Sequence, residues 1–303
     1  MRIFVTGASG WIGSAVVPEL LGAGHQVVGL ARSEASASAL AAAGATVQRG
    51  GIDDLDSLRA AAAASDGVIH LAFKHDIAFS GGFQDAADAD RRAIETIGDA
   101  LAGSGRPLVI ASGLLGLPAD RVVNERDLPD PASAGPRSAG AQAALALTTR
   151  GVRSSIVRLA PTVHDAGDHG FMATLVGIAR EKGISGYIGD GANHWPAVHR
   201  RDAARLFRLA LEKAPAGATL HGAADEGVPI RTIATVIGRQ LSLPVVSIPQ
   251  EEAGAHFGWL AAFLAMDVRA SHALTGELVG WQPTHPGLID DLEQGHYFQI
   301  RPV

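Results

Sequence analysis

The first 160 residues alternate short segments rich in β-branched residues with longer segments rich in alanine. Most of the short segments are apolar at successive positions, a pattern typical of strands that helices cover on both faces. Strands are predicted at 2–6, 26–30, 46–48, 67–71, 107–111 and 154–159, and helices at 11–21, 34–43, 55–63, 83–102 and 139–149. Repeated strand–helix–strand units of this kind predict an α/β fold with a doubly wound parallel sheet.

After Ala160 the pattern becomes less regular. Helices are predicted at 171–181, 201–213, 230–241, 258–265, 269–275 and 287–293, and strands at 219–221 and 245–248. The stretch from Ser112 to Pro136 holds four prolines, which a regular helix or a central strand does not tolerate. We therefore expect an ordered loop there, at the carboxyl end of a strand, where loops often carry chemistry.

Three glycines lie between the first predicted strand and the first predicted helix, in Thr6-Gly7-Ala8-Ser9-Gly10-Trp11-Ile12-Gly13. Glycines at this spacing allow a tight turn, close approach of a pyrophosphate and close packing of helix on strand. The helix N-terminus also attracts phosphate charge. Because the segment opens a strand–helix–strand unit, it predicts dinucleotide binding rather than a purely structural turn. The expected contacts are Gly7, Ser9, Gly10, Trp11, Ile12 and Gly13.

The end of the second predicted strand bears on which dinucleotide is bound. An acidic residue there would bind the ribose diol of NAD, whereas this chain has Leu30-Ala31-Arg32-Ser33. A guanidinium can bind a 2′-phosphate through two hydrogen bonds, and a carboxylate would repel it. Arg32 therefore predicts NADP as the cofactor, and the alternative is an ordinary exposed arginine at the start of a surface helix.

Several segments resemble the extended and atypical short-chain dehydrogenase/reductases over essentially the whole chain. They are the glycine loop, Asp66-Gly67-Val68-Ile69-His70-Leu71-Ala72, Arg158-Leu159-Ala160-Pro161-Thr162-Val163, and Trp195-Pro196-Ala197-Val198-His199-Arg200-Arg201-Asp202-Ala203-Ala204. The resemblance implies a dinucleotide-binding Rossmann domain over residues 1–160. Residues 161–303 then form a mixed segment, part of which returns to the Rossmann sheet while part makes a small substrate lobe. It also implies a homodimer.

The same resemblance assigns further cofactor contacts to Leu71, Ala72, Pro161 and Val163. At the third strand the family places an aspartate against the adenine amine, but this chain has Gly51-Ile52 there. We therefore expect Ile52 to contact adenine through its backbone.

The family's usual proton donor is absent from its usual place. Its chemistry uses a serine or threonine after the fifth strand and a Tyr-x-x-x-Lys pair on the next helix. Ser112 matches the first position, but the only tyrosines are Tyr187 and Tyr297, and no lysine lies between Lys74 and Lys182. We expect Ser112 to orient a substrate rather than to protonate it.

Two histidines that follow other strands are alternative donors. His75 follows the fourth predicted strand and His164 follows the sixth. Either histidine could equally be a solvated or hydrogen-bonded loop residue, since a polar residue in a loop often has no catalytic role. The twelve histidines show no ligand spacing typical of zinc, so no metal site is predicted.

Composition excludes several classes of partner and site. The 303 residues carry a net charge of −6 with no charged run at either end, which argues against nucleic acid and anionic membranes as partners. The absence of cysteine excludes disulfides and thiolate chemistry. The most apolar stretch, 258–266, is shorter than the about 20 residues that span a bilayer. Because the first strand begins at residue 2, we expect no signal peptide and a cytoplasmic protein.

Together these features predict an NADP(H)-dependent oxidoreductase that reduces a C=O or C=N bond of a small to medium hydrophobic substrate. A prochiral imine suits the missing tyrosine, because an iminium arrives already protonated. Two alternatives stay open: a non-catalytic NADP-sensing regulatory protein, and a nucleotide-sugar epimerase or dehydratase.

Overall fold

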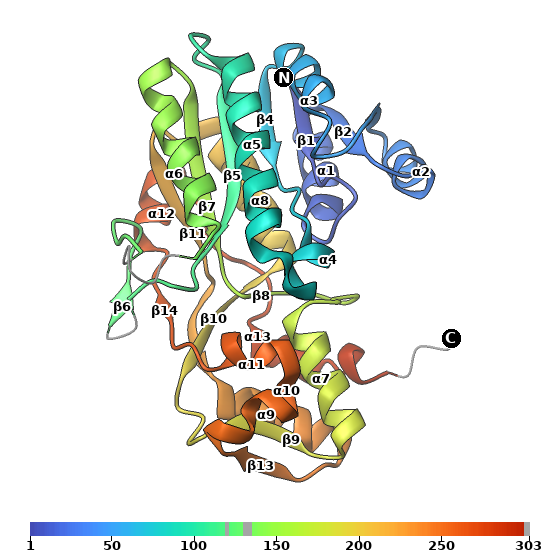
Figure 1. Cartoon of the computed structure of the whole chain (residues 1–303), viewed down its shortest axis with the longest axis vertical. Helices are drawn as coiled ribbons and strands as arrows, with labels where there is room; N and C mark the ends of the chain where they lie inside the picture. The colour runs from blue at the N-terminus through green and yellow to red at the C-terminus, as the bar shows by residue number, and fades with distance from the viewer. Residues whose placement is uncertain (119–120, 130–134, 300–303) are drawn as a thin grey trace.

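A computed structural model describes residues 1–118, 121–129 and 135–299. Its centre is a seven-stranded sheet with the order β11-β7-β5-β4-β1-β2-β3, in which every neighbouring pair is parallel (Figure 1). The strands are β1 (Arg2–Thr6), β2 (Gln26–Ala31), β3 (Thr46–Arg49), β4 (Gly67–His70), β5 (Pro107–Gly113), β7 (Arg153–Leu159) and β11 (Ala218–Gly222). The predicted α/β fold of the Rossmann type is confirmed.

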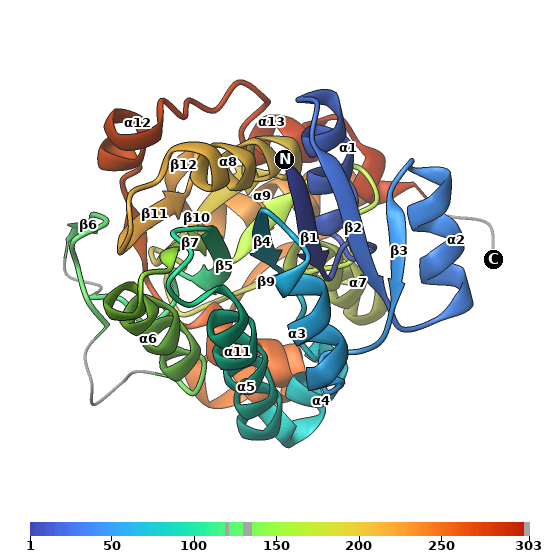
Figure 2. The same ribbon diagram turned by 90° about the horizontal axis from the view of Figure 1, so that it is seen from above.

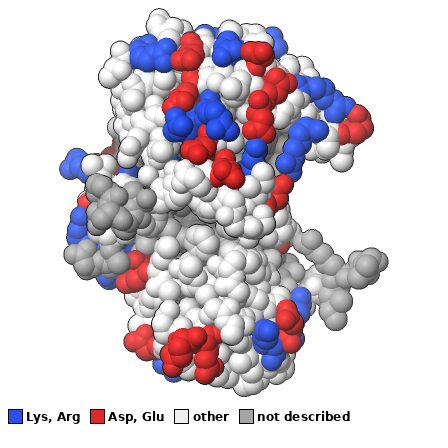
Figure 3. Space-filling view, viewed as in Figure 1, with Lys and Arg blue, Asp and Glu red and all other residues white. Residues whose placement is uncertain are grey.

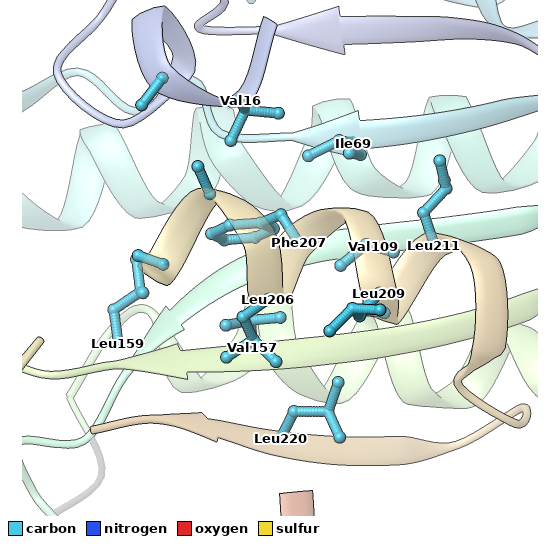
Figure 4. Packing of buried hydrophobic residues seen from close by; sticks show 14 of the residues in the cluster. Val16, Ile69, Val109, Val157, Leu159, Leu206, Phe207, Leu209, Leu211 and Leu220 are labelled. Atoms are coloured by element: carbon cyan, nitrogen blue, oxygen red, sulfur yellow. The ribbon is translucent and has the colours of Figure 1, made fainter. Parts of the chain in front are cut away.

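Helices cover both faces of this sheet, as Figure 2 shows from above. One face carries α1 (Gly13–Gly22) and α8 (Arg200–Lys213), and the other carries α3 (Leu55–Ala63), α5 (Phe83–Leu101) and α6 (Ser138–Ala146), while α2 (Glu34–Ala42) packs on β2 and β3. Phe207 and Leu206 of α8 are fully buried against strand residues such as Val109 and Val157 (Figure 4). This double cover explains why the strands are apolar at successive positions.

A smaller part of the chain lies beyond the carboxyl ends of the strands, in the lower half of Figure 1. It contains α7 (Phe171–Lys182), β9 (Ser185–Ile188), α9 (Ile230–Leu241), β13 (Val245–Ile248), α10 (Ala253–Phe257), α11 (Ala261–Leu264) and α13 (Leu288–Glu293). These elements enclose a hydrophobic core of their own. A three-stranded sheet of β12 (Asp225–Pro229), β10 (His194–His199) and β8 (Thr162–His164) lies between this part and the main sheet.

Two of the differences between the predicted and the observed local structure involve β6 (Val122–Val123) and β14 (Arg269–Ala270). Within the expected loop 112–136, β6 pairs in parallel with β14; residues 119–120 and 130–134 of that loop lie outside the described residues. The helix expected at 269–275 was wrong at its start, because β14 comes first and α12 (Ala273–Val279) follows. Each of these strands has only two residues, which leaves no periodicity to recognise.

The remaining elements are short. They are α4 (His75–Ile77), the π-helical turn η1 (Ala78–Gly82), and the 3-10 turns Leu147–Arg150, Gln250–Glu252, Gly258–Leu260 and His296–Phe298. Among the described residues, no helix combines the length and apolarity needed to cross a membrane.

The strand order places a topological switch point between β1 and β4. The chain proceeds from β1 to β2 and β3 on one side, and from β4 to β5 and β7 on the other. In open α/β sheets, ligands bind outside the carboxyl ends of the strands at such a point. The site should therefore be built from the loops that follow β1, β2, β4 and β5.

Candidate dinucleotide and substrate site

The loop after β1 ends in a helix N-terminus where three backbone donors are unused among the described residues. Helix α1 begins at Gly13, two residues later than predicted, so Trp11 and Ile12 belong to the turn. Within the described ranges, the backbone N–H groups of Trp11, Ile12 and Gly13 donate to no protein acceptor, and no acidic residue lies in the first turn. Unsatisfied donors at the positive end of a helix dipole form a site for an anion such as a pyrophosphate.

The three glycines of the loop are needed for different reasons. Gly7 has a φ of +63°, and a Cβ there would lie 2.8 Å from the backbone of Leu71 and Ala72. A Cβ on Gly13 would lie 2.1 Å from the carbonyl oxygen of Gly7. A Cβ on Gly10 would meet only that same oxygen, at 3.2 Å, and Gly10 is exposed together with Ser9. Gly7 and Gly13 therefore allow the loop to form, while Gly10 leaves its outer face clear for a ligand.

Trp11 connects the glycine loop to the segment that follows β7. Its indole Nε1 donates a 2.8 Å hydrogen bond to the carbonyl oxygen of Val163. Its ring lies 4.1 Å from the guanidinium carbon of Arg200 and 5.5 Å, edge to face, from the ring of His169. The structure thus brings Val163 beside the glycine loop, and Pro161, two residues earlier, is half-buried.

A buried hydrogen-bond relay holds the end of β4 against this loop. Thr6 Oγ1 accepts bonds from the backbone N–H groups of Leu71 and Ala72, at 3.2 Å each, so it must donate to His70 Nδ1, 2.8 Å away. His70 therefore carries its proton on Nε2 and donates it to Asp90 Oδ1 at 3.0 Å. The side chains of Thr6, His70 and Asp90 are buried, so the relay fixes the positions of Leu71 and Ala72.

Ion pairs join the segment after β4 to the ends of β2 and β3. The guanidinium of Arg32 lies 4.0 Å from Asp76 Oδ2, and its side chain is 76% exposed. Lys74 Nζ lies 2.6 Å from Asp53 Oδ2. Ile52, next to Asp53, is half-buried. Arg32 is therefore at the predicted edge of the site and is accessible to a solute.

Beside Ser112 the structure places an arginine that the sequence analysis did not single out. Ser112 is half-buried near the end of β5. Arg137 directly precedes α6, donates from Nη2 to the carbonyl oxygen of Ala111 at 3.3 Å, and has its guanidinium carbon 4.1 Å from the centre of the Phe73 ring. The only sequence signal is an arginine at the start of the helix expected to carry the missing tyrosine and lysine.

His75 lies on α4 next to this arginine. Its ring is 5.0 Å from that of Phe73, edge to face, and 5.7 Å from that of Phe79, on which it stacks. The pKa of His75 is lowered by burial of part of the ring and further by the positive charge of Arg137, while nearby carboxylates oppose the shift. His75 is therefore neutral at pH 7, and it can offer an N–H to an acceptor without being a charged acid.

His164 has a different environment. Its side chain is fully buried, its Nδ1 lies 2.9 Å from Asp291 Oδ2, and its ring meets that of His199 edge to face at 5.5 Å. A fully buried ring does not touch a solute, so this environment favours a structural role. The structure brings Ser112 and His75 near Arg137, and it holds His164 among buried side chains. In the described residues no group of three or more His, Asp or Glu side chains could hold a metal ion.

Aromatic side chains from both parts of the molecule meet beyond His75. The ring of Phe79, from η1, stacks on that of Trp259 at 4.5 Å, and both rings approach Phe171 of α7, at 6.4 and 5.6 Å. Phe263 of α11 lies 5.5 Å from Phe171. In Figure 3 the middle of this face, between the charged upper part and the lower end, is almost free of charged residues. The neighbourhood of the site is therefore apolar and aromatic.

The parallel sheet and the glycine loop define a fold of the Rossmann class, and the unused donors at α1 form a candidate anion site beside it. The model of the NAD dependent epimerase/dehydratase family matches residues 3–109. Over 298 residues the chain is 49% identical to Uncharacterized protein C2A9.02 of Schizosaccharomyces pombe, covering 98% of this chain and 100% of that protein. It is 43% identical over 298 residues to Uncharacterized protein YLL056C of Saccharomyces cerevisiae, covering 98% and 99%. The chain therefore belongs to the same family as these two fungal proteins, and the match of residues 3–109 to the NAD dependent epimerase/dehydratase model confirms the resemblance to atypical short-chain dehydrogenase/reductases.

Among solved structures, the fold is similar to that of DesIV, a dTDP-glucose 4,6-dehydratase from Streptomyces venezuelae with NAD and TYD bound. The TM-score is 0.77 at 20% identity, over 98% of this chain and 96% of the other. At this identity the similarity shows the fold, and the chemistry has to be argued from this chain's own residues.

Proposed function

We propose that this protein is an NADP(H)-dependent oxidoreductase that reduces a C=O or C=N bond of a small to medium hydrophobic substrate. The observation that carries the proposal is the set of unused N–H donors at the start of α1, with Arg32 exposed at the end of β2. A bound nicotinamide dinucleotide would supply the hydride.

The residues present suit such a cofactor. The N–H groups of Trp11, Ile12 and Gly13 would hold the pyrophosphate, since none of them has a protein acceptor among the described residues. Gly10 leaves room for it on the exposed side. Arg32 would bind a 2′-phosphate, because its present partner Asp76 is 4.0 Å away and both side chains are exposed.

On the substrate side we assign positioning roles to Ser112 and His75. Ser112 lies near the end of β5, the strand next to β4, and His75 is neutral and has an N–H to offer. Among the described residues neither has a charged partner that would make it a strong proton donor, so the final proton would come from water or from the substrate. The uncharged aromatic surroundings, including Phe79 and Trp259, support a hydrophobic substrate.

A second candidate function is that of a nucleotide-sugar epimerase or dehydratase. The similarity in fold to a dTDP-glucose 4,6-dehydratase supports it. The absence of a Tyr-x-x-x-Lys pair on α6, where Arg137 precedes Ser138–Ala146, weighs against it. The same absence leaves a third reading, an NADP-binding regulator without activity.

One series of measurements separates the three. NADPH and NADH are titrated into the protein and binding is followed by cofactor fluorescence; NADPH oxidation is then followed with ketones, aldehydes and cyclic imines. Consumption of NADPH supports the oxidoreductase. Conversion of UDP-glucose or dTDP-glucose without net NADPH consumption supports the second candidate, and binding without either reaction supports a regulator. Equal binding of NADH would overturn the choice of NADP.

We also propose that the protein acts as a homodimer, as its resemblance to the family implies, and that it works in the cytoplasm. Light scattering coupled to gel filtration measures the mass directly, and a monomer at micromolar concentration would overturn the first part.

A further inference from the structure

Arg137 is a charged group in an environment that is mostly apolar. Its guanidinium lies over the face of Phe73, which compensates part of the loss of hydration through a cation–π interaction. In the part of the chain that the structure describes, it makes one hydrogen bond, to the oxygen of Ala111, and no ion pair. An arginine side chain has five N–H donors and stays protonated at neutral pH. Most of these donors therefore remain available to another acceptor.

The buried carboxylate of Asp90 stabilises the positive charge of Arg137 without accepting a hydrogen bond from it in the described part of the chain. Asp90 Oδ1 accepts a 3.0 Å hydrogen bond from the protonated Nε2 of His70. A Cβ on Gly140, one turn into α6, would lie 3.1 Å from Asp90 Oδ2, so the carboxylate packs closely on that helix. Burial lowers the pKa of Arg137 and the charge of Asp90 raises it. Asp90 thus stabilises the cation from a distance, while its own oxygen is bonded to His70.

The position of Arg137 is at the reacting end of the proposed site. The hydrogen bond to Ala111 fixes the guanidinium beside Ser112, and Phe73 directly follows Ala72, which the relay from Thr6 holds against the glycine loop. The ring of His75 stands edge to face on the same Phe73. The carboxyl ends of β4 and β5 therefore bring together the fixed positive charge of Arg137, the apolar ring of Phe73, and the neutral polar side chains of Ser112 and His75.

We infer that Arg137 forms an anion-binding subsite, and that the substrate is an aromatic or conjugated carbonyl compound that carries a carboxylate. The carboxylate would accept two parallel hydrogen bonds from the guanidinium, the geometry that this group favours. The apolar body would lie against the aromatic side chains around His75. Within the choice between C=O and C=N, a fixed cation repels an iminium and so favours the carbonyl. The identity of the substrate rests on the proposed function, whereas the anion subsite stands by itself.

The experiment compares two probes that differ in charge. Benzoylformate and its methyl ester are titrated by calorimetry into the full-length protein, with and without saturating NADP⁺. In the wild type the acid should bind at least tenfold more tightly than the ester. Arg137→Gln, which removes the charge but keeps an uncharged polar side chain with two N–H donors, should abolish this preference and change the ester's affinity less than twofold.

Two further variants keep the result interpretable. Arg91→Gln removes an arginine of α5 that is paired with Glu95 at 2.8 Å, and should leave the acid's preference intact. Arg137→Lys should keep part of the preference, since it keeps the charge and loses the planar fork. The preference should not change between pH 5 and 9, whereas a subsite made by protonated His75 would lose its charge within that range, because burial and Arg137 lower the pKa of the ring.

The outcomes separate this inference from the proposed function. Equal binding of benzoylformate and its methyl ester by the wild type overturns the subsite, and this result does not depend on whether Arg137→Gln folds. A preference for the acid that persists in a folded Arg137→Gln overturns it as well. If NADPH binds and the acid preference is absent, the subsite is wrong while the cofactor assignment stands. If the wild type binds benzoylformate through Arg137 but binds neither dinucleotide, the proposed function is wrong and the subsite stands.

Discussion

Arg32 at the end of β2 and Asp76 on α4 face each other with 4.0 Å between the guanidinium and the carboxylate. Their side chains are 76% and 66% exposed, so water screens the pair and it contributes little to stability. A 2′-phosphate that approaches Arg32 must displace this partner and lie near its negative charge. The two residues should therefore affect NADPH binding in opposite directions.

Arg32→Ala should weaken NADPH binding about 10- to 100-fold, the worth of a hydrogen bond to a charged group of about 1.5–3 kcal/mol. NADH affinity should change less than threefold, because NADH lacks the 2′-phosphate. Fluorescence titration of both cofactors measures this. An equal loss of affinity for NADPH and NADH would mean that Arg32 stabilises the conformation of the loop and does not bind the 2′-phosphate.

Asp76→Asn should tighten NADPH binding by about two- to fivefold, since it removes a charge that competes for Arg32 and repels the phosphate. NADH binding should stay the same. Asp56→Asn is the matched control, because Asp56 is exposed and paired with Arg59 through Nη1 at 2.7 Å. A weaker NADPH complex in Asp76→Asn would show that the carboxylate helps to hold the loop and does not compete.

The strands of the Rossmann sheet were predictable because their burial is recorded in the sequence. For β1, β2, β3 and β4 the predicted ends are within one residue of the observed ones, since helices on both faces require apolar residues at successive positions. β8 was missed because it has only three residues, and β10 was missed because Pro196 within it argues against a strand. The start of helix α1 was predicted two residues too early, because the apolar residues Trp11 and Ile12 continue the helical pattern into the preceding turn.

The cofactor side of the site was predictable from the sequence and the substrate side only in part. The glycine loop acts through its own backbone, so its residue spacing carries the information. Arg137 acts beside Ser112 only because α5 and α6 pack together and the 3.3 Å bond to Ala111 directs the side chain. His164 was considered as a donor because it follows a strand, but its burial against Asp291 depends on α13, 127 residues away.

Gly10 and Gly13 should respond differently to the same substitution. Gly13→Ala puts a methyl group 2.1 Å from the oxygen of Gly7 and should lower the free energy of unfolding by about 2–3 kcal/mol. Gly10→Ala meets that oxygen at 3.2 Å from an exposed position, so it should fold normally and bind NADPH at least tenfold more weakly. Urea unfolding and cofactor titration measure the two effects.

Gly22→Ala provides the control for these variants, because a Cβ there would meet nothing within 4 Å. Its stability and cofactor affinity should equal those of the wild type or rise slightly, as alanine favours a helix. Normal stability of Gly13→Ala together with full NADPH affinity of Gly10→Ala would refute the roles assigned to these two glycines of the loop after β1.

His221 should make the protein less stable in mild acid. It is fully buried, and this burial lowers its pKa to about 4; its Nδ1 contacts the oxygen of Ser271 at 2.9 Å and its Nε2 faces Arg158. The unfolded chain takes up the proton near pH 6.5 and the folded one only near pH 4, so stability is full above 6.5 and falls as the pH drops toward 4. This group should account for a loss of up to about 3 kcal/mol over that window.

Unfolding by urea between pH 7.5 and 4.5 tests this for the wild type and His221→Gln. The variant should be less stable at pH 7.5 but should lose stability less steeply below pH 6.5. Parallel slopes for the two proteins would assign the acid sensitivity to other groups, such as His199, whose pKa is also lowered by burial.

Ser112→Ala should reduce kcat/KM by no more than about 10³-fold, near the usual worth of one positioned hydrogen-bonding group. No Tyr-x-x-x-Lys pair accompanies Ser112. The charged group beside it is Arg137, which donates a hydrogen bond to the carbonyl oxygen of Ala111 but does not release a proton at neutral pH. The proton should then come from water, and the rate should depend on pH through the substrate.

The pH profile of kcat/KM, measured with substrates of different basicity, decides whether a side chain donates after all. A limb that stays at one pH across substrates would belong to the enzyme. If it arose from His75 it should fall below pH 6.5, because burial and Arg137 both lower the pKa of that ring, and it should disappear in His75→Ala. If it disappeared in His164→Ala instead, the buried ring beside Asp291 would have to be reached by the substrate. That result would require a structure in which α13 has moved away from β8, because in this one the side chain of His164 is fully buried.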